Sequence, residues 1–257
     1  MVIHRHRMFV LLIILISILS NCELFDLGSD LEDPDPPAAP NIIPQSLPDD
    51  SLQTGIGPAD YVRGIYFEWY NNSEKDIGGY YIYRRTESSD QTFIKLDTVE
   101  FYTSIIEANS YIDTLVDYYK NYFYFITAYD YGNNESKPSD TIRYMLVEKV
   151  DLVTPNGKMD PPLNNFIWYE FTRLTNEYVL EMEDLENSET IWVTRFNRSN
   201  YEEEQQMKNY NFDGSSKFPK LTKNKVYRWR IHSIFMVDRS NCDLSGAKSN
   251  WNYFTIE

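Results

Sequence analysis

The chain has 257 residues, 16% of them aromatic, and a formal net charge of −15 at pH 7. An acidic chain repels phosphate backbones, which proteins bind through clustered Lys and Arg, so we exclude nucleic acid as a partner. The aromatic and β-branched content is too high for a chain that is disordered overall. These properties indicate a folded protein whose partner is not a nucleic acid.

The first 21 residues have the pattern of an export signal. Arg5 and Arg7 give a basic start, and residues 9–19 form an uncharged run in which Ser17 is the only interruption. This run is shorter than the about 20 apolar residues that a membrane-spanning helix needs. We therefore predict that residues 1–21 are a signal peptide.

Cys22 follows this signal, and the arrangement resembles the lipobox of bacterial lipoproteins. In that family the signal is cut before the cysteine, which then carries the lipid. Asn21 departs from the usual Gly, Ala or Ser, and the alternative is an ordinary secretory signal with an incidental cysteine. The resemblance implies a lipid-anchored protein of the cell envelope. Glu23 is not the Asp that often signals retention in the inner membrane, which favours the outer membrane.

We predict a tether at residues 22–57. Prolines are concentrated between Glu23 and Pro58, among acidic residues. Proline restrains φ and removes a hydrogen-bond donor, and like charges repel, so this segment should be extended with little packed structure. Its acidic residues also resemble surface-export signals of some lipoproteins, with a merely solvated linker as the alternative.

The rest of the chain predicts β-strands. Short runs rich in Tyr, Ile, Val and Thr are separated by turn residues, at 65–69, 80–83, 93–96, 111–112, 122–129 and 141–147. No window between residues 60 and 147 keeps a helical period with proper caps. This pattern is typical of an antiparallel sandwich, so we predict an all-β fold.

The plan repeats after about 100 residues. Trp69 ends one strand and Trp168 lies in the matching strand, while Tyr122 and Tyr227 occupy matching positions further along. We predict two tandem antiparallel β-sandwiches, at residues 58–148 and 149–257.

The first copy resembles the fibronectin type III domain. It has Trp69 on the second strand, the run Gly79–Arg84 on the third, Tyr122 at the place of the tyrosine corner, and a final loop over Thr127–Ser139. The resemblance implies that the Tyr122 hydroxyl ties the corner back to nearby backbone. It is specific for fold and does not indicate an activity.

The second copy matches less completely. Trp168, Tyr227 and Ser249 fit, but Glu177 replaces the glycine and Tyr201–Phe212 looks like an insertion. We interpret it as a diverged fibronectin type III domain or another immunoglobulin-like sandwich.

Catalytic motifs are absent from the sequence. His232 is the only histidine after the signal, and no nucleophile elbow, zinc-protease pair, phosphate loop or Cys-x-x-Cys occurs. The acidic run Glu202–Glu204 is typical of a solvated loop, and Asp130–Glu135 lacks the ligand spacing of a calcium loop. We expect Cys242 to be a free thiol, and we predict no enzyme, no cofactor and no metal.

Strand phase predicts the outer face of each copy, because side chains alternate across a strand. In the second copy, Arg228, Arg230 and His232 should point outward, opposite Glu181 and Glu183. Opposite charges on adjoining strands indicate an ordinary solvated face.

The first copy differs, since four rings should point outward together. With Tyr122, Tyr124 and Ile126 inward, the outward side chains are Tyr81, Tyr83, Phe123 and Phe125. A contiguous exposed apolar surface usually marks an interaction site, so these rings are our candidate ligand-binding residues. The alternatives are that the second domain or the linker covers them, or that the phase is shifted by one residue.

The sequence favours a non-enzymatic, lipid-anchored envelope protein whose sandwiches mediate protein interaction or adhesion. The alternative is a carbohydrate-binding surface lipoprotein that stacks sugars on the four rings, and a third, weaker hypothesis is a hydrolase accessory or a cryptic glycosidase. Four tripeptides also resemble a short bacterial O-glycosylation motif: Asp50-Ser51-Leu52, Asp97-Thr98-Val99, Asp113-Thr114-Leu115 and Asp140-Thr141-Ile142.

Overall fold

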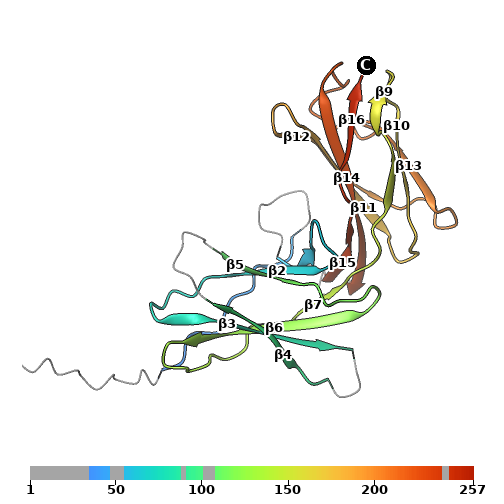
Figure 1. The fold of residues 1–257 in the computed structure, drawn as a ribbon. Helices are drawn as coiled ribbons and strands as arrows, with labels where there is room; N and C mark the ends of the chain where they lie inside the picture. The colour runs from blue at the N-terminus through green and yellow to red at the C-terminus, as the bar shows by residue number, and fades with distance from the viewer. Residues whose placement is uncertain (1–34, 47–54, 88–90, 101–107, 239–242) are drawn as a thin grey trace, which may run out of the picture.

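The computed structural model describes residues 35–46, 55–87, 91–100, 108–238 and 243–257 (Figure 1). Across these ranges the secondary structure consists of strands with no helix, which confirms the all-β prediction. The predicted signal peptide, Cys22, Cys242 and the tripeptide at residues 50–52 lie outside the described residues. No helix in those ranges has the length and hydropathy to cross a membrane.

The N-terminal unit, strands β1 to β7, contains two antiparallel sheets (Figure 1). One has the order β1-β2-β5, with β1 Gly57–Pro58, β2 Ile65–Tyr70 and β5 Ala108–Asp113. The other has the order β4-β3-β6-β7, with β4 Ile94–Glu100, β3 Ile77–Thr86, β6 Asn121–Asp130 and β7 Ile142–Met145.

The core between these sheets is built by strand alternation. Tyr122, Tyr124 and Ile126 of β6 are buried in it, as the sequence predicts. The ring of Phe67 on β2 lies 4.9 Å from that of Tyr124, so the two sheets meet through aromatic contacts. Such pairs add to the free energy gained by burying their apolar area.

The C-terminal unit, strands β8 to β16, has a second pair of sheets. One has the order β13-β10-β8, with β13 Gln205–Asn209, β10 Asn165–Tyr169 and β8 Asp151–Thr154. The other has the order β12-β11-β14-β16-β9, with β12 Glu189–Asn197, β11 Glu177–Asp184, β14 Val226–Asp238, β16 Asn252–Ile256 and β9 Gly157–Met159. The short strand β15, Asp243–Lys248, pairs with β14. A separate core includes Trp168, Trp192 and Trp229.

The tyrosine corners are present in both units. The backbone N–H of Asp117 donates to the Tyr122 hydroxyl at 2.9 Å, and that of Thr222 donates to the Tyr227 hydroxyl at the same distance of 2.9 Å. Both donors precede the tyrosine by five residues, so the same local geometry repeats.

The interpretation of Tyr201–Phe212 as an insertion is wrong. Within it, Gln205–Asn209 forms β13 and pairs with every residue of β10, from Asn165 to Tyr169. The strand was not predicted because its sequence is polar and lacks an apolar alternation. Gln206 is the only buried residue of this strand, and its other four residues are exposed or half-exposed.

The expectation of an unpacked tether is wrong for residues 41–43, and also for Ile56, which is buried in the core, and Gly57, which begins β1. Ile42 forms a β-bridge with Trp69. The backbone N–H of Ile43 donates to the Glu68 carbonyl at 3.1 Å, and the backbone N–H of Tyr70 donates to the Asn41 carbonyl at 3.0 Å. The segment runs along the same edge of β2 that β1 occupies further on, and Ile43 is buried. The extended conformation was predicted, but this edge offers it backbone partners.

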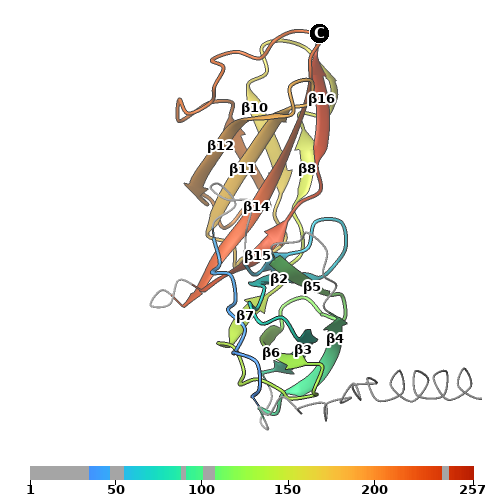
Figure 2. The ribbon, with the colours of Figure 1, turned by 90° about the vertical axis from the view of Figure 1, so that its left-hand side faces the viewer.

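The two units are joined by the hairpin of β14 and β15, which lies at the junction in Figure 2. Leu146 bridges to Gly246 in parallel, and the N–H of Val147 donates to the Gly246 carbonyl at 3.2 Å. Val147, Phe235 and Ala247 form a small buried cluster there. Backbone bonds and apolar burial together therefore hold the C-terminal hairpin against the N-terminal unit.

Candidate functional site

The four predicted rings all lie on the outer face of β3 and β6, which we call the aromatic face. Tyr83 pairs directly with Phe125 across the two strands, and their rings stack at 4.6 Å between centroids. Tyr81 instead stacks on Tyr129, at 4.5 Å. The strand phase is therefore correct, and the rings are half-buried rather than fully exposed.

Two glycines of β3 make room for the second of these pairs. A Cβ built on Gly78 would lie 2.7 Å from the Tyr129 ring, and one on Gly79 would lie 2.7 Å from the Tyr129 hydroxyl. Gly78 and Gly79 are thus strand backbone over which an aromatic ring lies.

The fourth ring, Phe123, lies apart from the stacked pairs. The guanidinium of Arg85 is 3.7 Å from its centroid, and that of Arg143 is 5.6 Å away. The ammonium of Lys95 covers Tyr81 in the same way, at 3.1 Å. The sequence pattern did not predict these cations, nor the added rings of Tyr129 beside Tyr81 and of Phe93 beside Phe125, although Tyr129 shares the strand phase of Phe125.

The aromatic face also carries one anchored hydroxyl. Tyr83 donates to Glu135 at 2.8 Å, and Thr127 donates to the same carboxylate oxygen at 2.7 Å. Burial, the hydrogen bond and the charge of Glu135 raise the pKa of Tyr83 to about 12. The ring of Tyr83 is therefore fixed in place as a neutral phenol at physiological pH.

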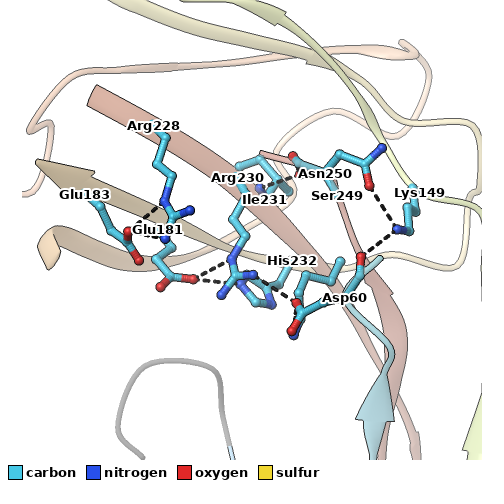
Figure 3. Close-up of polar contacts among 11 residues, drawn as sticks. Asp60, Lys149, Glu181, Glu183, Arg228, Arg230, Ile231, His232, Ser249 and Asn250 are labelled. Atoms are coloured by element: carbon cyan, nitrogen blue, oxygen red, sulfur yellow. Dashed lines mark hydrogen bonds and ion pairs between the residues drawn. The ribbon is translucent and has the colours of Figure 1, made fainter. Parts of the chain in front are cut away.

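A second candidate site lies at the junction of the units (Figure 3). Arg230 of β14 donates to Glu181 of β11 at 2.7 Å and to Asp60 of the N-terminal unit at 3.1 Å. Lys248 of β15 donates to the same Asp60 oxygen at 2.8 Å. His232 lies 3.2 Å from the Glu181 oxygen that Arg230 binds.

The expectation that His232 lies on a solvated face is wrong, although its strand phase is correct. It points away from the core of its own unit, but only 5% of its surface is exposed, and it lines the cavity between the units. Burial lowers the pKa of His232 to about 4, against the hydrogen bond to Glu181, which raises it. Burial raises the pKa of Glu181, but the hydrogen bonds and charges of His232 and Arg230 bring it down to about 2.

Beyond the junction, the charged face of the C-terminal unit agrees with the prediction. Arg228 of β14 lies directly opposite Glu183 of β11 and donates to its carboxylate at 2.7 Å. Trp251 lies against this row, with its ring 4.1 Å from the guanidinium groups of both Arg228 and Arg230.

A cavity of about 360 Å³ lies beside this network, between the units. The C-terminal unit contributes Glu181, Arg230, His232, Ile234 and Lys248 to its wall. The N-terminal unit contributes residues 56–60 with Gln45, Tyr66 and Tyr144.

The remaining sequence candidates are not assembled into a site. Glu202–Glu204 are exposed on a loop, and the Asp130 carboxylate accepts hydrogen bonds from the backbone and side chain of Asn134 at 2.8 and 2.9 Å. No group of three or more His, Cys, Asp or Glu side chains suited to a metal ion occurs in the described ranges.

Comparisons with known proteins give weak likenesses of fold. No family model and no curated protein matches the chain. The crystal structure of the FN1–FN3 domains of chicken CNTN1 is similar at 14% identity and a TM-score of 0.31, covering 86% of this chain and 67% of that one. A β-1,2-glucanase from Parabacteroides distasonis is similar at 25% identity and a TM-score of 0.30, covering 45% of this chain and 14% of the glucanase. A myokine structure is similar at 11% identity and a TM-score of 0.27, covering 42% of this chain and 96% of the myokine chain. TM-scores this low carry no argument about function.

Proposed function

We propose that this chain is a non-enzymatic, lipid-anchored protein of the cell envelope whose aromatic face binds another protein. The observation that carries the proposal is the composition of that face, where Tyr81, Tyr83, Phe123 and Phe125 lie among Lys95, Arg85 and Arg143. Aromatic residues and Arg are enriched at protein interfaces and carry most of the binding free energy there.

The position of the aromatic face supports the same proposal. The larger contacts between the two units in the described residues run through β1, β7 and β15 rather than through the outer face of β3 and β6. The C-terminal unit therefore does not cover the aromatic face in the described residues, whereas His232 on the charged face of the C-terminal unit is buried at the junction.

The ring geometry favours a protein over a polysaccharide on this face. Tyr83 and Phe125 lie within 20° of parallel and cover each other, and Tyr81 is covered by Tyr129 on one side and by Lys95 on its face. A sugar stacks on a free ring face, whereas a protein partner also uses ring edges and cationic groups.

Site-specific photo-crosslinking in the native cell tests this proposal. A photoreactive phenylalanine analogue replaces Phe125 in one variant and Tyr169, which is exposed on β10 of the C-terminal unit, in a matched control. We expect a discrete crosslinked protein from position 125 and none from position 169. The crosslink should disappear when Arg85→Glu is added, because this substitution replaces the cation over Phe123 by a carboxylate.

Two results would contradict the protein-binding proposal. One is the absence of any protein adduct at position 125 in a folded variant. The other is retention of the full chain by a polysaccharide gel that the double variant Tyr83→Ser/Phe125→Ser abolishes, since that result assigns the face to a glycan.

The anchor is tested separately from the binding face. If Cys22 carries lipid, Cys22→Ala moves the chain from the membrane fraction to the soluble fraction, and the mature protein from the native cell carries a diacylglycerol mass on its first residue. A soluble wild-type chain would contradict the anchor and leave the binding face untouched.

A further inference from the structure

We propose that the junction cavity is a binding site for a small neutral saccharide, of one or two sugar units. Binding sites for small molecules have volumes of about 300–1,000 Å³, are largely pre-formed, and occur preferentially at domain interfaces. The cavity between the units, at about 360 Å³, meets the volume and the location. This inference is independent of the protein-binding proposal, which concerns a different face.

The charges around the cavity indicate a neutral ligand. Asp60 and Glu181 supply two carboxylates, Arg230 and Lys248 supply two cations, and His232 is held neutral by burial. The carboxylates and cations already pair with one another at 2.7–3.1 Å. A ligand with a net charge would leave an uncompensated charge in a half-enclosed site, which is costly.

The same groups retain hydrogen-bonding capacity for hydroxyls. In the described residues, Arg230 and Lys248 both bind Oδ1 of Asp60, and Arg230 and His232 both bind Oε2 of Glu181. One oxygen of each carboxylate therefore has no partner among those residues, and Arg230 donates through Nε and Nη1 only. Acceptors and a donor that converge in this way suit a ligand whose groups both donate and accept, as sugar hydroxyls do.

The rest of the wall suits the apolar face of a sugar ring. Ile56, Pro58 and Ala59 line the cavity from the N-terminal unit, and Ile234 and Leu244 line it from the C-terminal unit. The Tyr66 phenol, which donates to Glu68 at 2.7 Å, also lies in the wall. Apolar contacts on one side and charged acceptors on the other would orient a pyranose ring.

The test is isothermal titration calorimetry on the full chain in detergent micelles. The probes are D-glucose, D-galactose, N-acetylglucosamine, cellobiose and maltose, with glucuronate and alanine as an anionic and a zwitterionic comparison. We expect at least one neutral sugar to bind with a Kd below about 1 mM and to bind more tightly than either charged comparison. Failure of every neutral sugar to bind, or preference for a charged probe, would overturn the proposal.

Variants locate the bound sugar. Gly57 lines the cavity, and a Cβ added there meets nothing within 4 Å, so an alanine fits at this position without a clash. We expect Gly57→Phe to weaken binding at least about tenfold and Gly57→Ala to change it little. Asp60→Asn should also weaken binding, because it replaces one acceptor oxygen by an amide donor.

The matched control is the double variant Tyr83→Ser/Phe125→Ser on the aromatic face. It should bind the sugar as the wild type does. If this variant loses binding while Gly57→Phe keeps it, the sugar lies on the aromatic face and the cavity assignment is wrong. Photo-crosslinking at position 125 is unaffected by either result, so the two proposals fail separately.

Discussion

Lys248 of the C-terminal unit donates a hydrogen bond of 2.8 Å to Asp60 of the N-terminal unit, and Arg230 reaches the same carboxylate oxygen at 3.1 Å. Burial raises the pKa of Asp60. The hydrogen bond to Lys248 and the charges of Lys248 and Arg230 together lower this pKa by more than burial raises it, so the net shift is downward. Asp60 is therefore ionised at neutral pH and electrostatically links the units.

Asp60→Ala should weaken the junction without unfolding either unit. The Asp60 side chain is 48% exposed, so solvent screens its two ion pairs and the expected loss is about 1 kcal/mol. We expect the single unfolding transition in urea to broaden or split, because the units become less coupled. Asp117→Ala is the matched control, since Asp117 forms an exposed pair with Lys120 inside one unit. An equal effect of both variants would refute the coupling role.

The stability of the junction should depend on pH through His232. Its pKa is about 4 in the folded chain and 6.5 in the unfolded reference, so the unfolded state binds the proton more tightly. Stability is complete above pH 6.5 and falls as the pH drops toward 4, by about 1 kcal/mol per pH unit. Glu181, with a pKa of about 2 against 4.5, contributes stability above pH 4.5 that is lost toward pH 2.

The difference between wild type and His232→Gln isolates this contribution. His232 is the only histidine in residues 22–257, so no other imidazole titrates in that part of the chain. We expect the urea-unfolding free energies of the two proteins to converge as the pH falls from 6.5 to 4, because only the wild type loses the contribution of a neutral His232. Parallel curves over that interval would mean that His232 is protonated as readily in the folded chain as in the unfolded one.

Much of the fold followed from strand alternation, which is a local property. The inward phase of Tyr122 and Tyr227, the outward phase of Phe125, and the pairing of Arg228 with Glu183 all agree with the structure. Each depends on the two-residue period and on which strands are neighbours, and both can be read from the sequence once the fold class is recognised.

The junction could not be read from the sequence, because it depends on contacts between residues far apart in the chain. Gln45 exchanges two hydrogen bonds with Leu244, both at 3.0 Å and 199 residues apart. His232 lines the same cavity between the units as Gln45 and Leu244, and its own strand pattern does not predict this position. The polar strand β13 was missed for a different reason: four of its five residues remain exposed or half-exposed, so it lacks an apolar pattern.

The tyrosine corners should contribute equally in the two units. Tyr122→Phe and Tyr227→Phe each leave a corner N–H, that of Asp117 or of Thr222, without its acceptor. We expect each variant to lose about 1–2 kcal/mol of unfolding free energy. Tyr131→Phe is the matched control, because Tyr131 is 70% exposed and its hydroxyl is in water. A corner variant no less stable than this control would contradict the structural role.

Gly246 should be the least replaceable residue of the β14–β15 hairpin. A Cβ at this position would lie 1.9 Å from the Ser233 carbonyl oxygen, and its φ of +156° is one that other residues rarely adopt. Gly246→Ala must therefore push β15 away from β14, which also disturbs the bridge to Leu146 and the bond from Val147.

We expect Gly246→Ala to cost more than about 3 kcal/mol of unfolding free energy, well above the about 1 kcal/mol of a strained φ alone. Gly214→Ala separates the two effects, because Gly214 has a φ of +75° and an added Cβ there meets nothing within 4 Å. Hydrogen exchange should show faster exchange at Val147 in the Gly246 variant, since its N–H loses the Gly246 carbonyl. If Gly246→Ala and Gly214→Ala lose the same unfolding free energy, the hairpin accommodates the added methyl group. The close contact between Gly246 and Ser233 would then not be required for the junction.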